Sequence, residues 1–192
     1  GSKYMKNLTF FDSYYELLNN KVNSVDRNLL LNVASYIRDV ANNSGKVIII
    51  GNGGSAAIAS HITIDLTKAA NIKAINFNEP SLLTCLSNDY GYENWAKKAI
   101  EFYAEKNDLV VLISSSGQSK NIINCAIKAK DMGLSIITLS GFMKNNPLRE
   151  MGNVNLWVDS ESYNIVEITH QTWLLSVVDY LIENKIIVKG KE

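Results

Sequence analysis

The sequence predicts an α/β fold, a three-layer sandwich in which a five-stranded parallel sheet lies between helices. Five short runs rich in β-branched and other apolar residues recur along the chain, and segments with helical periodicity separate them. Such alternation is typical of a parallel sheet with helices on both faces. The chain has 192 residues, of which 46% are hydrophobic and 20% are charged, as in ordinary globular proteins. We therefore expect one domain over residues 1–192, with a core of its own.

The first part of the chain, residues 5–44, predicts two helices that precede the sheet. Apolar residues recur there at helical spacing, and the second helix is expected to start near Ser24, with Asp26 in its first turn. We interpret residues 1–4 as a tag or vector remnant, with the natural start near Met5.

Residues 45–192 predict the α/β core and a long closing helix. The first strand is expected at 46–50, where the apolar rhythm changes from helical spacing to a continuous buried run. The other expected strands are 73–77, 108–113, 135–139 and 154–158, and the expected helices are 55–69, 91–105, 119–132 and 163–185.

The charge balance excludes some classes of function. Nineteen basic and nineteen acidic residues give a formal net charge of zero, which argues against coating nucleic acid or an anionic membrane. No apolar run approaches the roughly 20 residues of a membrane span.

Cys85 and Cys125 are far apart, so we expect two reduced, mostly buried thiols in a cytoplasmic protein.

A glycine-rich turn, residues 51–55 (Gly-Asn-Gly-Gly-Ser), follows the first expected strand. Glycines let a ligand approach the backbone, and the N-terminus of the next helix offers free N–H groups to an anion such as phosphate. A tight turn without a ligand and a dinucleotide site are the alternatives, since Gly51 and Gly53 match part of the dinucleotide fingerprint while Ala56 stands at its sixth position.

A serine-rich segment, residues 114–119 (Ser-Ser-Ser-Gly-Gln-Ser), follows the third expected strand. Its hydroxyl and backbone donors suit a phosphate monoester, and the absence of a Gly-Lys-Ser/Thr triplet disfavours ATP hydrolysis. The alternative is a flexible loop whose serines only cap the following helix. Ligands of open parallel sheets bind beyond the carboxyl ends of the strands, so two such loops together favour a phosphate site.

Three motifs in this order resemble the SIS (sugar isomerase) phosphosugar-binding family, and within it the isomerases of sedoheptulose 7-phosphate. They are residues 51–57 with His61, residues 88–91 (Asn-Asp-Tyr-Gly) and residues 113–119. The resemblance covers nearly the whole chain and implies a flavodoxin-like SIS domain that assembles as a homotetramer with shared active sites. It also implies a sugar phosphate as substrate and no nucleotide cofactor.

The resemblance assigns roles to individual positions of this sequence. It implies that the phosphate-binding serines are Ser114, Ser115, Ser116 and Ser119. It implies that the residues near the sugar are Asn52, Gly53, Gly54, Ser55, Asn88 and Asp89. The acid–base residues and zinc ligands would be His61, Asp65 and Glu167.

The chain departs from the family's pattern at three positions on the two helices that carry these acid–base residues. Asp65 shortens the family's glutamate, Glu167 replaces a glutamine, and Leu175 stands where a histidine is expected. That histidine is a zinc ligand and proton carrier in the family, so we expect any zinc to be weakly held. His170, on the same helix as Glu167, is either structural or recruited in its place.

The leading hypothesis is an aldose–ketose isomerase of a sugar phosphate that acts through an enediolate, with Asp65 and Glu167 as candidate bases. The alternative is a relative that binds a phosphosugar or a protein, such as the replication initiator, without catalysis. Leu175 is its main support. A nucleotide-binding module rests on the glycine-rich turn alone.

Overall fold

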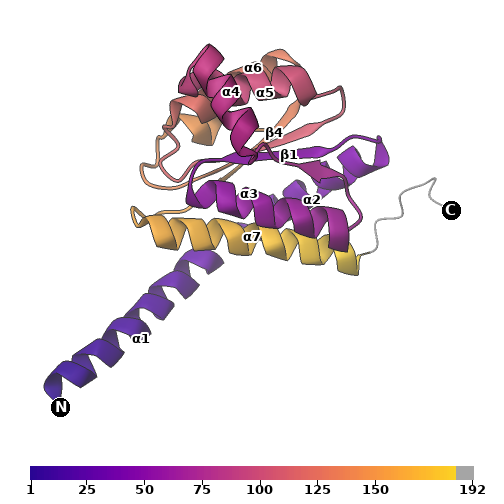
Figure 1. Cartoon of the computed structure of the whole chain (residues 1–192). Helices are drawn as coiled ribbons and strands as arrows, with labels where there is room; N and C mark the ends of the chain where they lie inside the picture. Colours follow the sequence, from indigo (N-terminus) through magenta and orange to yellow (C-terminus); the bar gives the residue numbers. More distant parts are fainter. Residues whose placement is uncertain (185–192) are drawn as a thin grey trace.

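The computed structural model describes residues 1–184 and contains one five-stranded sheet with the order β2-β1-β3-β4-β5, all parallel. The fold class expected from the sequence is confirmed, and each expected strand is present (Figure 1). The strands are β1 (Val47–Gly51), β2 (Ala74–Ile75), β3 (Leu109–Ile113), β4 (Ser135–Ser140) and β5 (Val154–Trp157).

The central strands are buried on both faces, because helices cover the sheet on each side. Every residue of β1 and β3 is buried, which explains their continuous apolar sequence. Gly51 at the end of β1 pairs with Ile113 at the end of β3. This register places the glycine loop (residues 51–55) beside the serine loop (residues 114–119).

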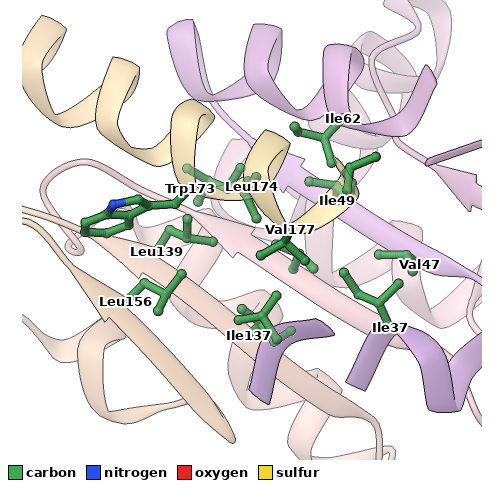
Figure 2. Packing of buried hydrophobic residues seen from close by; sticks show 14 of the residues in the cluster. Ile37, Val47, Ile49, Ile62, Ile137, Leu139, Leu156, Trp173, Leu174 and Val177 are labelled. Carbon is green, nitrogen blue, oxygen red and sulfur yellow. The ribbon is translucent and has the colours of Figure 1, made fainter. Parts of the chain in front are cut away.

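The sheet divides the core into two clusters, one under each helical layer. Helices α2 (Arg27–Asn42), α3 (Gly54–Ile64) and α7 (Tyr163–Glu183) cover one face of the sheet (Figure 1). In Figure 2, Trp173 and Val177 of α7 pack toward Leu139 and Ile137 of β4. The other face is covered by α4 (Pro80–Tyr90), α5 (Trp95–Tyr103) and α6 (Lys120–Asp131), which bury residues such as Trp95, Ile100 and Ile122.

Several element boundaries differ from the sequence-based expectation. Helix α4 was not predicted, although Glu79 caps it through Leu82 N–H and Pro80 occupies its first turn. Gly91, with φ +85°, ends α4, and the helix expected at 91–105 is a 3₁₀ turn (Tyr92–Asn94) followed by α5. Residue 185 of the expected closing helix lies outside the described residues.

The ends of α2 and α3 also differ from the sequence-based expectation. Helix α2 starts at Arg27, three residues later than expected, because the Asp26 side chain caps it by accepting from Asn28 N–H. The helix after β1 changes to a π-helix at Asp65–Ala69.

Helix α1 (Ser2–Asn23) extends away from the rest of the molecule and has no buried residue (Figure 1). Near its end, Trp173 Nε1 donates to the carbonyl of Val22 at 2.9 Å. The large exposed side chains of this helix are Tyr4, Met5, Leu8, Phe10, Phe11, Tyr15 and Leu17. A search of residues 1–184 finds no helix with the length and hydropathy of a membrane span.

The two cysteines differ in their surroundings. Cys125 is buried in the core as predicted, and burial raises the pKa of its thiol. The prediction was wrong for Cys85, which is exposed because α4 lies on the surface and turns this residue outward. Both thiols are free.

Candidate functional site

The serine loop folds back on itself through its own hydroxyl groups. Ser114 Oγ accepts from Gly117 N–H at 3.1 Å and lies 3.2 Å from Ser119 Oγ, and Ser116 Oγ accepts from Gln118 N–H. Gly117 has φ +65°, which allows this tight turn. The loop is therefore preorganised by local hydrogen bonds.

Ser115 is the exception within the loop. Its Oγ is buried and has no hydrogen-bond partner among the described residues. A buried hydroxyl without a partner costs free energy unless a ligand or water satisfies it. The Ser115 hydroxyl is therefore available for a hydrogen bond to a water molecule or a ligand.

The serine loop and the glycine loop line one pocket of about 110 Å³ at the carboxyl ends of β1 and β3. Seven of the residues expected to act in catalysis or substrate binding meet there. They are Asn52, Ser55, Ser114, Ser115, Ser116, Ser119 and Glu167, and the pocket is completed by Ile113 and Tyr163.

Glu167 reaches this pocket from α7 because Gly54 leaves room for it. A Cβ atom on Gly54 would overlap the Glu167 carboxylate. Burial raises the pKa of Glu167 above its ordinary value, since a charged carboxylate loses solvation there. A carboxyl group with a raised pKa beside an anion site is suited to accept and return a proton.

Asn52 and Ser55 of the glycine loop form another part of the pocket wall. Gly53 has φ +51° and stands at the N-cap of α3, where the N–H groups of Ser55 and Ala56 donate to the carbonyl of Asn52. Asn52 bonds to Asn121 of α6 and to Tyr92. These bonds connect the glycine loop to the helix that follows the serine loop.

His61 lies on the exposed side of α3 and contacts α7. Gln171 Nε2 lies 2.6 Å from His61 Nδ1, and with the amide as donor the histidine carries its proton on Nε2. Asp65 lies one turn further along, at the start of the π-helix. Neither His61 nor Asp65 lines the pocket that contains Glu167.

The positions of these side chains determine whether they could hold zinc. Over the described range 1–184, no three His, Cys, Asp or Glu side chains lie close enough together to hold one metal ion. Leu175 packs against the apolar core, and Gln171 already occupies one ring nitrogen of His61. The donors of residues 1–184 in a single chain therefore do not fit a three-ligand zinc site.

His170 is structural in this chain. It is fully buried, and its Nε2 donates to the carbonyl of Ser140 at 2.8 Å, at the end of β4. Burial lowers its pKa to about 4, so the ring is neutral.

Asn88 and Asp89 lie outside the pocket, on α4. Asn88 Nδ2 donates to Asp89 Oδ1 at 3.1 Å, and both side chains are exposed. Within this chain they do not meet the serine loop.

Four residues near the site were not singled out from the sequence: Tyr92, Asn121, Tyr163 and Gln171. Asn121 follows the serine segment by two residues, and its polar side chain on a buried helix face was a usable signal. Gln171 is one helical turn from Glu167, which was also available as a signal. The tertiary fold brings Tyr92 and Tyr163 to the site, and no local sequence pattern indicated this.

The fold and the pocket define an α/β domain of the SIS type, and comparison with known proteins assigns the family. The chain belongs to the SIS domain family, whose model matches residues 9–141. Among curated relatives, it is similar to a phosphoheptose isomerase of Glaesserella parasuis, at 34% identity over 77% of this chain and 80% of the relative. A phosphoheptose isomerase of Helicobacter pylori is 41% identical over 57% of this chain and 61% of that protein.

Solved structures share the fold at lower identity. The phosphoheptose isomerase from Neisseria gonorrhoeae superposes with a TM-score of 0.83 at 22% identity, covering 92% of this chain and 98% of that one. The corresponding protein from Francisella tularensis gives a TM-score of 0.82 at 24% identity, with the same coverage.

Proposed function

We propose that this chain is an aldose–ketose isomerase of a sugar phosphate, with sedoheptulose 7-phosphate as its substrate. The observation that supports this most strongly is the shared pocket, in which hydroxyl donors of the serine loop face a carboxyl group of raised pKa. Curated relatives of this chain carry the name phosphoheptose isomerase, which agrees with this chemistry.

The serine loop is the proposed anchor for the phosphate. Serine hydroxyl and backbone N–H groups donate to phosphate oxygens, and the partnerless Ser115 hydroxyl gains an acceptor when the anion binds. Among residues 1–184, no arginine or lysine lines this pocket, so the anchor formed by these residues is neutral and relies on hydrogen bonds.

Glu167 is the proposed base. Isomerisation removes a proton from the hydroxyl-bearing carbon next to the carbonyl, which gives an enediolate, and a proton is then returned to the former carbonyl carbon. The C–H bond at one carbon breaks and a C–H bond at its neighbour forms, while a hydroxyl proton moves between the two oxygens. Asp65 and His61 are the proposed partners on α3 and its extension.

The pocket of one chain is small for a whole sugar phosphate. Pockets that bury a ligand of drug size are about 300–1,000 Å³, whereas this pocket is about 110 Å³. It suits the phosphate and adjoining carbons, and we propose that a neighbouring subunit encloses the rest of the sugar.

Self-association has support from α1. This helix buries none of its residues within the chain and exposes a stripe formed by Tyr4, Leu8, Phe11 and Tyr15, at spacings of three and four residues. Contiguous exposed apolar residues are typical of an interface between proteins. We propose a homotetramer that buries this stripe.

Two further proposals concern the location of the protein and its affinity for zinc. We propose a cytoplasmic location, supported by two free thiols, which persist in a reducing compartment. We also propose that zinc, where it binds, is held weakly, because Leu175 offers no ligand atom.

The test is a coupled assay of the full chain with sedoheptulose 7-phosphate and with free sedoheptulose, after dialysis against a chelator and again with zinc added. We expect turnover of the phosphorylated sugar only, with most of the rate retained after chelation. Binding of the sugar phosphate with no turnover, with or without zinc, would overturn the proposal and favour a binding relative.

A further inference from the structure

We infer that Asn121 and Tyr92 are positioning residues that fix the side-chain amide of Asn52 so that it presents an N–H donor to the substrate. Asn52 lines the pocket, whereas Asn121 and Tyr92 do not. The inference rests on the proposed function, because it assigns a role in binding the sugar phosphate and in its turnover.

The two asparagine side chains form a reciprocal pair. Asn52 Nδ2 donates to Asn121 Oδ1 at 3.0 Å, and Asn121 Nδ2 donates to Asn52 Oδ1 at 2.9 Å. Asn52 belongs to the glycine loop and Asn121 to the first turn of α6, directly after the serine loop. The pair therefore joins the two loops that line the pocket.

A backbone donor determines which way both amides face. Ile122 N–H is shared between the carbonyl of Ser119 at 3.1 Å and Asn121 at 3.0 Å. An amide nitrogen of Asn121 at this place would set a donor against a donor, so Oδ1 of Asn121 faces the N–H. The atom of Asn52 that faces this oxygen must then be its nitrogen. It follows that Asn52 Oδ1 faces Tyr92, whose hydroxyl donates to it at 2.9 Å.

This orientation leaves a specific donor unused. Asn52 Oδ1 accepts two hydrogen bonds, and one of its two amide hydrogens is used by Asn121. The second amide hydrogen has no protein partner in the part of the chain described here. Because Asn52 lines the pocket, we assign this hydrogen to an oxygen of the sugar phosphate.

The supporting residues are themselves held in place. Asn121 is 3% exposed, so its amide is shielded from competing water. Asn124, one turn further along α6, donates to the carbonyl of Glu93 and holds the 3₁₀ turn that bears Tyr92. Both partners of Asn52 thus depend on α6.

The test compares Tyr92→Phe and Asn121→Ala with the wild type. Tyr92 is 61% exposed, so we expect Tyr92→Phe, which removes one hydroxyl group, to leave the fold intact. This variant therefore tests the inference even if Asn121→Ala fails to fold. Tyr103→Phe is the control, since Tyr103 is 48% exposed and its hydroxyl makes no hydrogen bond within residues 1–184. We expect kcat/KM for sedoheptulose 7-phosphate to fall roughly 5- to 10-fold in Tyr92→Phe, as for one lost hydrogen bond, and by at least as much in Asn121→Ala, which removes both bonds of the pair. The control should show no such fall.

A double-mutant cycle separates positioning from a general structural effect. In an Asn52→Ala background, Tyr92→Phe should cause no further loss, because the group it positions is absent. Equal losses with and without Asn52, or no loss in Tyr92→Phe alone, would overturn the inference.

Calorimetry with sedoheptulose 7-phosphate distinguishes failure of this inference from failure of the proposed function. A chain that binds the sugar phosphate without turnover lacks the proposed activity. The same cycle in binding affinity then still tests the positioning of Asn52, with the same expected non-additivity.

Discussion

At the residue scale, Gly54 and Glu167 depend on each other. The carboxylate occupies the space that a side chain at position 54 would fill, and it does so beside the serine loop. A long side chain can move away from a collision at little cost to folding. The position of the proposed base is therefore easier to disturb than the stability of the fold.

Gly54→Ala tests this dependence. We expect the thermal midpoint to change by only a few degrees, because the colliding atoms are the end of a flexible side chain, while turnover falls at least about tenfold as the carboxylate is displaced. In a Glu167→Ala background the same change should cost no further activity. A fully active Gly54→Ala enzyme would contradict the assigned position of the base.

Ser116→Ala tests the phosphate anchor. Loss of one hydrogen bond to a charged oxygen should weaken binding of the sugar phosphate by about 1–2 kcal/mol in calorimetry, with little effect on the free sugar. Ser81→Ala on the exposed surface of α4 is the control. Equal affinity of the wild type for phosphorylated and free sugar would remove the serine loop from the binding site.

His170 makes folding stability depend on pH. Its pKa is about 4 in the folded chain against an ordinary value of 6.5, so the unfolded chain binds more protons between these values. Stability is then fully present above about pH 6.5 and declines as pH falls toward 4, by up to about 3 kcal/mol. Denaturant titrations should show a smaller decline in His170→Gln, and an unchanged decline would contradict the assignment.

At the scale of secondary-structure elements, the sequence predicts the strands better than the helix ends. A buried parallel strand has a continuous apolar run, which local sequence reveals. Helix α4 was missed although Glu79 and Pro80 form a start signal, because an exposed helix with one buried residue, Leu86, has weak periodicity. The change to a π-helix at Asp65 has no comparable sequence signal.

Helix α1 leaves most of its apolar side chains exposed within one chain. We expect Leu8→Glu combined with Phe11→Glu to lower the mass measured by sedimentation, since charges would enter the proposed interface. Glu16→Lys on the same helix is the control for a change of charge alone. A wild type that sediments as a monomer would contradict the proposed self-association.

At the scale of the whole molecule, the parallel sheet brings the glycine and serine loops together. Their meeting was predictable from the sequence, because both follow adjacent strands and the carboxyl ends of parallel strands share one edge. The approach of Glu167 was expected only through the family resemblance. The Asn52–Asn121 pair and the contact between Gln171 and His61 depend on tertiary distances, which no local pattern contains.

The departures from the family also acquire a physical meaning at this scale. Leu175 contributes to the apolar core, and His170 supports the end of β4 instead of replacing the missing ligand. We therefore propose that carboxylates carry the proton transfer. Glu167 has the stronger claim, because it lines the pocket, which Asp65 does not, and burial raises its pKa.

The most direct test of the account is the turnover of sedoheptulose 7-phosphate by the wild type, Glu167→Gln and Asp65→Asn, measured beside the affinity of each for the same sugar phosphate. The account predicts that Glu167→Gln lowers kcat by about 10²–10⁴, as for loss of a general base, with affinity unchanged or slightly raised. Asp65→Asn should cause a smaller loss. Wild-type turnover that survives both substitutions would contradict the assignment of proton transfer to these carboxylates.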